Sequence, residues 1–224
     1  MDSPFTSNLA VDLGRIGYGE AYRLQKHLLD LVKGNSASGF LLFLEHTPVF
    51  TVGRKPVPEN FAGVQVVQTE RGGDVTYHGP GQIVIYPIVR IENGGNLDVR
   101  GFVHFVENTV IEMLGTAGYS ATVGEEPGIW ISGDGTPRKI ASIGMAIDHG
   151  ISYHGISVNI SGEVLEGFSR IRPCGLDPSV MGYVAMSAEA VRKAFISAFS
   201  GRFGPFREIG RVPFMKALSS LPGP

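Results

Sequence analysis

The sequence has little cysteine, no excess charge of one sign and no long hydrophobic run, and each shortage excludes a class of protein. A single cysteine, Cys174, excludes an intrachain disulfide and fits a reducing compartment, so we expect a cytoplasmic protein. The net charge of −2 lacks the basic excess of nucleic-acid-binding proteins, and we expect no nucleic-acid partner. The longest apolar runs, such as FLLFLE (40–45) and QIVIYPIV (82–89), are far shorter than the roughly 20 residues of a membrane span, and we expect no membrane partner.

Several short motifs are absent as well. The first ten residues, MDSPFTSNLA, show no basic region followed by an apolar run, so we expect no signal peptide. The sequence has no H-E-x-x-H and no paired C-x-x-C, which argues against a metal site. It also lacks the G-x-x-x-x-G-K-[ST] and G-x-G-x-x-G patterns of nucleotide-binding loops. We therefore expect neither a metal nor another cofactor.

What is present predicts a folded α+β protein. With 224 residues, 43% hydrophobic and 18% charged, the chain suits one large domain or two small ones. No repeat or low-complexity linker divides it, so we expect a single domain over residues 1–224, with a mobile Pro- and Gly-rich tail from about residue 201.

Periodicity predicts the elements of this domain. Apolar residues at helical spacing predict helices over 17–34, 99–118 and from Ser187 to about Ser200. Apolar and β-branched runs predict strands over 39–46, within 46–54, and over 64–69, 82–90, 128–132, 139–148 and 151–160. The last two strands flank a short turn at His149-Gly150, which predicts a hairpin. Because several strands are adjacent in sequence, we expect a mixed or antiparallel β-sheet packed with helices.

One glycine-rich segment has neither a helical nor a strand pattern: RGGDVTYHGPGQ (71–82), here called the signature segment. Its four glycines allow the backbone to approach a ligand closely, and Arg71, Thr76, Tyr77 and His78 add side-chain donors. The alternative is a turn of ordinary Gly and Pro chemistry.

Cys174 is the first candidate for chemistry. It lies between Pro173 and Gly175 in a predicted loop (169–180), with Arg170 and Arg172 close by in the sequence. Basic neighbours favour a thiolate, and a thiolate is a nucleophile for acyl transfer. The alternative is a small buried hydrophobic residue.

Lys139 and the histidines are further candidates. Lys139 begins the predicted strand 139–148 and could stabilise a thiolate or move a proton, although a solvated lysine at a strand end is the commoner case. His78 and His154 could each act as a base for Cys174, and His46 and His104 are weaker alternatives.

Together these segments resemble a known family. The signature segment, FLLFLEHTPVFTVGR (40–54) before it, and KIASIG, YHGISVNI and IRPCGL after it, resemble in order the octanoyltransferases of lipoate biosynthesis, over roughly residues 17–177. The resemblance implies the fold of the biotin and lipoate protein ligases. It also implies transfer of an octanoyl group from octanoyl-acyl carrier protein to a lysine of lipoyl domains, in 2-oxoacid dehydrogenase complexes and the glycine cleavage H protein. The thioester is already activated, so no ATP is required.

The resemblance also implies roles for individual residues. Cys174 corresponds to the family's nucleophile and Lys139 to the residue that assists it. The substrate-binding positions correspond to Arg71, Gly72, Gly73, Asp74, Val75, Thr76, Tyr77, His78, Ser142, Ile143, Gly144, Gly155, Ile156 and Ser157. Departures are small: Asp74 occupies a variable position, Ser142 replaces a common alanine, and the linker SGDGTPR (132–138) is slightly long.

Three other functions remain alternatives to the octanoyltransferase. An ATP-dependent lipoate or biotin protein ligase would share the fold but would have no use for a nucleophilic cysteine. A Cys–His thioester hydrolase would use His78 or His154 as base and water as acceptor. A non-catalytic acyl- or protein-binding module would form no adduct on Cys174. In the octanoyltransferase hypothesis, His78 positions the substrate and is not a base.

Overall fold

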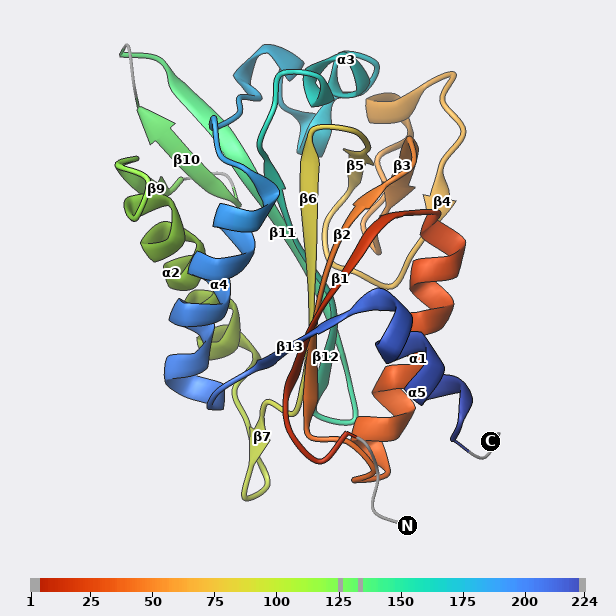
Figure 1. Cartoon of the computed structure of the whole chain (residues 1–224). Coiled ribbons are helices and arrows are strands. Elements are labelled where there is room, and N and C mark those ends of the chain that lie inside the picture. Colours follow the sequence, from red (N-terminus) through yellow and green to blue (C-terminus); the bar gives the residue numbers. More distant parts are fainter. Residues whose placement is uncertain (1–4, 125–126, 133–134, 222–224) are drawn as a thin grey trace.

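A computed structural model describes residues 5–124, 127–132 and 135–221 of the chain, and shows helices on both faces of one large sheet (Figure 1). The sheet has the strand order β13 (Arg207–Gly210), β1 (Leu9–Ile16), β2 (Gly39–His46), β6 (Gln82–Val89), β12 (Ile151–Asn159), β11 (Pro137–Asp148), β10 (Ile129–Ser132) and β9 (Ala121–Val123). The pairs β13–β1 and β1–β2 are parallel, and the other neighbouring strands are antiparallel. The predicted mixed sheet is confirmed.

Two pairs of helices cover the sheet. Helices α1 (Tyr18–Lys33) and α5 (Arg211–Ser219) pack on one face, and α2 (Val99–Gly115) and α4 (Ala188–Phe203) pack on the other (Figure 1). Strand β2 shows why its sequence is a continuous apolar run: Leu41 and Phe43 enter the core under α2 and α4, whereas Phe40, Leu42 and Leu44 enter the core under α1.

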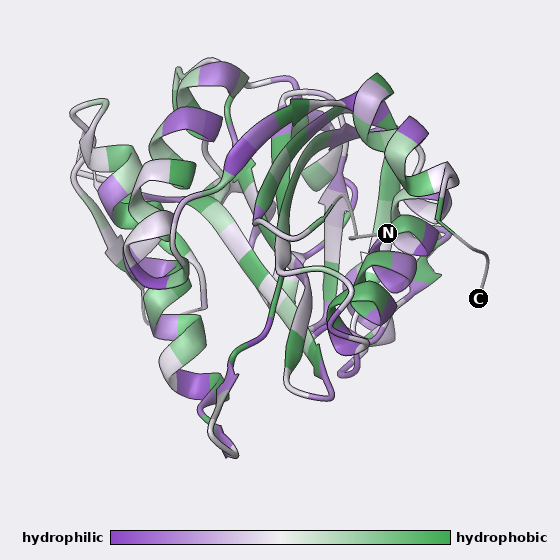
Figure 2. Ribbon diagram, turned by 60° about the horizontal axis from the view of Figure 1, so that its bottom comes forward, coloured by the Kyte–Doolittle hydropathy of each residue, from purple (hydrophilic) through white to green (hydrophobic). Residues whose placement is uncertain are grey.

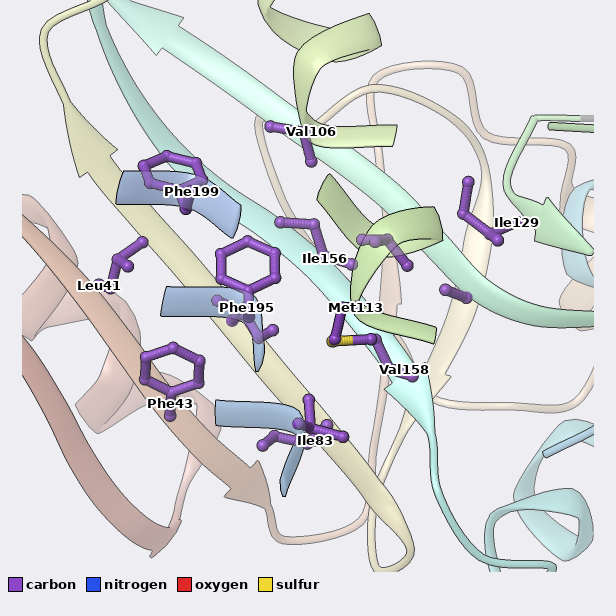
Figure 3. Close-up of a cluster of buried hydrophobic side chains, with 14 of the residues drawn as sticks. Leu41, Phe43, Ile83, Val106, Met113, Ile129, Ile156, Val158, Phe195 and Phe199 are labelled. Atoms are coloured by element: carbon purple, nitrogen blue, oxygen red, sulfur yellow. The ribbon is translucent and has the colours of Figure 1, made fainter. Parts of the chain in front are cut away.

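Aromatic packing holds α4 against the sheet. Phe195 of α4 contacts Phe43 of β2 edge to face, with ring centroids 6.1 Å apart, and Phe199 lies beside Phe195 (Figure 3). Figure 2 shows that the hydrophobic bands gather on the sheet strands, while the helices alternate between hydrophobic and hydrophilic bands. The central strands β6 and β12 are buried along their whole length, whereas much of β11 is half-buried.

A second, smaller sheet lies beside the large one. It has the order β4 (Val67–Gln68), β3 (Val49–Val52) and β5 (Val75–His78). The short helices η1 (Pro58–Phe61), α3 (Val164–Phe168), η2 (Pro173–Gly175) and η3 (Pro178–Val180) surround it, and β7 (Glu92–Asn93) pairs with β8 (Asn96–Leu97) in a separate ribbon. A cluster that includes Val75, Phe168 and Ile171 packs β5 against α3 and the segment before Cys174.

Most predicted elements are present, but one predicted strand is much shorter and several elements were missed. The three helices and the β11–β12 hairpin are confirmed, but the strand expected over 64–69 is limited to Val67–Gln68. Strands β1, β5, β9 and β13 and helices α3 and α5 were not predicted. The Pro- and Gly-rich tail contains β13, which pairs with β1, and α5, which buries Phe214. Among the described residues, no helix is long and apolar enough to cross a membrane.

Candidate active site

A cavity of about 1040 Å³ lies where β6, β11 and β12 meet the signature segment and η2. It brings together fifteen of the sixteen residues predicted from the sequence: Cys174, Lys139, Arg71, Gly72, Gly73, Asp74, Val75, Thr76, His78, Ser142, Ile143, Gly144, Gly155, Ile156 and Ser157. These residues come from four separate segments of the chain, which only the folded sheet makes adjacent. A volume of this size suits a small-molecule or cofactor-sized ligand.

Cys174 lies at this cavity on a tight turn formed by residues 172–175, here called the Cys174 turn. Its side chain is exposed, so the alternative of a buried hydrophobic cysteine is wrong. Its backbone has φ +54°, in the left-handed region, and Gly175 follows with φ +81°. A non-glycine residue adopts this conformation at a cost, and such strain concentrates at functional sites. The turn presents the thiol to the cavity.

Lys139 is on β11, and only 2% of it is exposed, so the alternative of a solvated strand-end lysine is wrong. Its strand pairs with Trp130 of β10, and its carbonyl oxygen accepts a hydrogen bond from Gly182 N at 3.0 Å. Gly128 lies directly beside the side chain: a Cβ there would come within 2.5 Å of Lys139 Cε. Gly128 thus leaves room for the lysine to reach the cavity wall. Residues 133 and 134 of the preceding linker lie outside the described residues.

The signature segment is fixed by backbone hydrogen bonds to both sheets. Arg54 N donates to Arg71 O at 3.0 Å, Lys55 N donates to Gly73 O at 3.1 Å, and Gly72 N donates to Met145 O of β11 at 3.1 Å. The backbone passes so close to Gly53 that a Cβ there would lie 2.7 Å from Arg71 O. This is a fixed wall, and not an ordinary surface turn.

Arg71 contributes a buried positive charge to this wall. Its guanidinium donates to Thr51 O at 2.7 Å and to Gly72 O at 3.0 Å. Burial lowers the pKa of Arg71, while electrostatic interactions with Tyr18 and Cys174 oppose that shift. Because an arginine stays protonated in proteins, a cation lies within electrostatic reach of the Cys174 thiol.

His78 is held in a chain of hydrogen bonds that leads to Lys139. Its Nδ1 donates to Gln82 Oε1 at 2.7 Å, since that oxygen can only accept, and Gln82 Nε2 donates to Asn159 Oδ1 at 2.9 Å. Asn159 Nδ2 donates to Gly182 O at 2.8 Å, and Gly182 N donates to Lys139 O. Burial lowers the pKa of His78 to about 3. A ring so hard to protonate is a poor general base at neutral pH and a good positioning group.

The three other histidines that the sequence suggested as bases, His46, His104 and His154, are no better placed. Burial lowers the pKa of His46 and of His154 to about 4 in each case. His46 contacts Tyr86 Oη at 2.7 Å and does not line the cavity, whereas His154 lines it, with Nε2 3.4 Å from Glu70. His104 is exposed and is not part of the cavity wall.

Tyr77 is the one predicted residue that does not line the cavity. Its ring packs against Phe50 and Phe168, with centroids 5.1 and 5.9 Å away. It fills the space over Gly167, where a Cβ would overlap the ring. On β5, Val75, Thr76 and His78 all line the cavity, whereas the Tyr77 ring packs on the side of α3.

Sequence analysis missed several residues of the cavity wall. Tyr18 begins α1, Tyr86 lies within the apolar strand β6, and Val57 and Asn60 lie in and beside η1. Tyr86 could have been found, because a tyrosine in a fully buried strand requires a polar partner. No group of three or more His, Cys, Asp or Glu side chains among the described residues could hold a metal ion.

Comparisons with known proteins identify the family. Residues 17–200 match the model of the lipoyl protein ligase A/B catalytic domain. The chain is 41% identical over 172 residues to a probable octanoyltransferase of Pyrobaculum arsenaticum, covering 75% of this chain and 77% of the relative. It is 37% identical over 202 residues to an octanoyltransferase of a Geobacter species, covering 87% and 95%. The chain belongs to the octanoyltransferase family.

Comparison with solved structures tests the expected fold. A bipartite lipoate protein ligase from Thermoplasma acidophilum superposes with a TM-score of 0.68 at 17% identity, covering 96% of this chain and 91% of that one. A biotin acetyl-coenzyme A carboxylase synthetase from Helicobacter pylori gives 0.51 at 13% identity, covering 94% and 78%. The expected biotin and lipoate protein ligase fold is confirmed. Membership of an enzyme family rules out the non-catalytic binding module.

Proposed function

We propose that this octanoyltransferase moves an octanoyl group from octanoyl-acyl carrier protein, through a thioester on Cys174, to a lysine of lipoyl domains. The observation that carries the proposal is the exposed thiol of Cys174 on a strained turn, at a cavity that Lys139 and Arg71 also line. Acceptors would be the lipoyl domains of 2-oxoacid dehydrogenase complexes and the glycine cleavage H protein, as the family implies.

The first half-reaction forms the acyl-enzyme. The Cys174 thiolate, stabilised by the cations of Lys139 and Arg71, attacks the thioester carbonyl of the donor. The bond from the carbonyl carbon to the carrier's sulfur breaks, and that sulfur leaves with a proton from Lys139. One thioester replaces another, so little free energy is lost and no ATP is required. Lys139 is left neutral.

The second half-reaction uses that neutral lysine. The amine of the acceptor lysine attacks the octanoyl carbonyl, and Lys139 takes the proton that the amine loses as the amide forms. The Cys174 thiolate leaves, and the thiolate and ammonium are restored. Backbone amides of the glycine-rich wall are suitable donors for the oxyanion of either tetrahedral intermediate.

The cavity supports an aliphatic acyl chain. Val75, Val84, Ile143 and Ile156 contribute apolar wall beside the polar groups already described. Each methylene that such a wall removes from water contributes about 0.8 kcal/mol of binding free energy, enough to distinguish acyl chains of different length.

Intact-mass analysis after incubation with octanoyl-acyl carrier protein tests the covalent route. We expect one octanoyl increment on the wild-type enzyme and none on Cys174→Ala. Subsequent addition of a lipoyl domain is expected to remove the increment and to place an octanoyl amide on the acceptor lysine. No increment on the wild type in this experiment would overturn the covalent route.

The same experiment separates the two remaining alternatives. Release of free octanoate without amide would indicate a Cys–His hydrolase, which the low pKa values of His78 and His154 already disfavour. Full activity of Cys174→Ala with ATP and free octanoate would indicate a ligase.

A further inference from the structure

The Cys174 turn requires support from outside itself. Two hydrogen bonds close the turn: Gly175 N donates to Arg172 O at 2.9 Å, and Leu176 N donates to Pro173 O at 3.1 Å. Both are local, so neither fixes the position of the turn relative to the rest of the protein. Gly175 adopts its positive φ without strain, but a non-glycine residue such as Cys174 stays in the left-handed region only where the surroundings over-determine the backbone. A backbone hydrogen bond joins the start of this turn to a distant segment: Arg172 N donates to Asn60 O at 2.8 Å.

Asn60 is in turn held by a buried carboxylate of the signature segment. Asn60 Nδ2 donates to Asp74 Oδ2 at 2.6 Å, and Val57 N donates to Asp74 Oδ1 at 2.9 Å. Only 6% of Asp74 is exposed, so these charge-assisted bonds form in a poorly solvated place. Although Asp74 borders the cavity, its two carboxylate oxygens face η1. The path thus runs from the signature segment through Asp74 and Asn60 to the Cys174 turn.

We propose that Asn60, fixed by the Asp74 carboxylate, is a positioning residue that holds the Cys174 turn in place for acyl transfer. The inference rests on the proposed nucleophilic role of Cys174. It adds Asn60, which the sequence motifs do not assign, and gives Asp74 a role other than the substrate binding that the resemblance implies. Neither side chain acts on the substrate in this role. Asp74 and Asn60 act through the backbone of Arg172, two residues before the thiol.

The donor and acceptor pattern gives the proposal a sharp test. Asp74 offers only acceptors to two donors, so Asp74→Asn would bring its own NH₂ group against one of them. Asn60→Asp would bring two carboxylates together. The double variant Asp74→Asn/Asn60→Asp restores the pairing: the new amide donates to the new carboxylate, and its oxygen still accepts from Val57 N.

The experiment measures octanoyl transfer and the alkylation of Cys174 by iodoacetamide as a function of pH in all three variants. We expect each single variant to lose at least about tenfold in kcat, with a shifted alkylation profile and KM for the octanoyl carrier protein changed by no more than about twofold. The double variant is expected to recover kcat and the alkylation profile to within about threefold of the wild type.

Ser187→Ala is the matched control, because it removes the capping bond to Ala190 N at the start of α4, away from the cavity. It should lower the melting temperature without changing kcat. Wild-type kcat and alkylation in both single variants would overturn the proposal, as would a double variant no better than the worse single one. Alkylation requires no octanoyl substrate, so this result is distinct from a wild-type enzyme that forms no octanoyl adduct.

Discussion

Two segments meet at the cavity, and they are built in opposite ways. Most of the signature segment is buried, and backbone hydrogen bonds from Arg54, Lys55 and Gly72 fix it to its surroundings. The Cys174 turn is short, has two left-handed residues and exposes its thiol. In the proposed function, the contrast separates two tasks: a preorganised wall would hold the acyl group, and an exposed turn would present the thiol to the protein substrates.

The titratable groups follow the same division. Burial keeps His78 uncharged on the wall, with its pKa at about 3, so the richest motif of the sequence supplies no base. Lys139, far from the signature segment in sequence, lines the same cavity as the Cys174 turn. Substitution of Lys139 should therefore have the largest effect on octanoyl transfer.

Lys139→Met should lower kcat for octanoyl transfer by about 10²- to 10³-fold, because it removes both the cation that stabilises the thiolate and the group that moves the proton. Single-turnover kinetics would measure adduct formation on Cys174 and transfer to the lipoyl domain separately. Lys193→Met, which removes an exposed lysine paired with Glu189 on α4, is the control and should leave both rates unchanged. Wild-type transfer by Lys139→Met would show that the proton is moved by another group.

Gly53→Ala tests whether the wall must be rigid. The new Cβ would lie 2.7 Å from Arg71 O and from Gly72 O, so the signature segment must shift. We expect a loss of about 1–3 kcal/mol in the free energy of unfolding and at least a tenfold loss in kcat/KM, measured by urea denaturation and transfer kinetics.

Gly115→Ala is its matched control, since a Cβ at this position of α2 meets nothing within 4 Å. This change should keep wild-type activity and slightly raise stability. If Gly53→Ala behaved like Gly115→Ala, the signature segment would not be the fixed wall inferred from the structure.

The same contrast explains what the sequence could predict. Strands 39–46 and 82–89 are buried on both faces, and their unbroken apolar runs identified them. Cys174 lies among Pro and Gly in a loop, which pointed to its exposure. In contrast, β1 pairs with β13, which lies about 200 residues later in the sequence, and pairing at such a separation leaves no local sequence pattern.

Errors at the site have equally physical causes. Glycines flank β5 inside the signature segment, so the sequence did not indicate a strand there, and Tyr77 was expected at the cavity with its neighbours, whereas its ring packs against Phe50 and Phe168. Asn60 had no local signal, since its importance comes from Asp74 and Arg172, which only the fold brings near. The motifs identified the wall of the cavity and the proposed nucleophile, but not the hydrogen bonds that connect them.

Acid should destabilise the fold through His46, which is buried at the end of β2 and lies outside both the signature segment and the Cys174 turn. His46 has a folded-state pKa of about 4, below its ordinary 6.5, so the unfolded chain binds protons more readily between these values. The stabilisation is fully present above about pH 6.5 and is lost as pH falls toward 4, by at most about 1.4 kcal/mol per pH unit. His46→Gln can still donate to Ile16 O and accept from Tyr86, and its unfolding free energy should fall less steeply over this range. If urea denaturation showed that the unfolding free energies of the wild type and His46→Gln fall in parallel with pH, His46 would not be the cause of the loss in acid.

Tyr77→Phe gives the smallest expected effect and separates the two faces of β5. The ring packs against Phe50 and Phe168, and phenylalanine keeps that packing, so we expect kcat/KM within about twofold of the wild type and an unfolding free energy within about 1 kcal/mol. Thr76→Val is the matched change on the cavity side, where Thr76 Oγ1 is buried and makes no hydrogen bond among the described residues. We expect that hydroxyl to form a hydrogen bond to the bound substrate, so Thr76→Val should raise KM more than Tyr77→Phe does. A larger loss at Tyr77 than at Thr76 would show that substrate contact extends to the face of β5 that packs on α3.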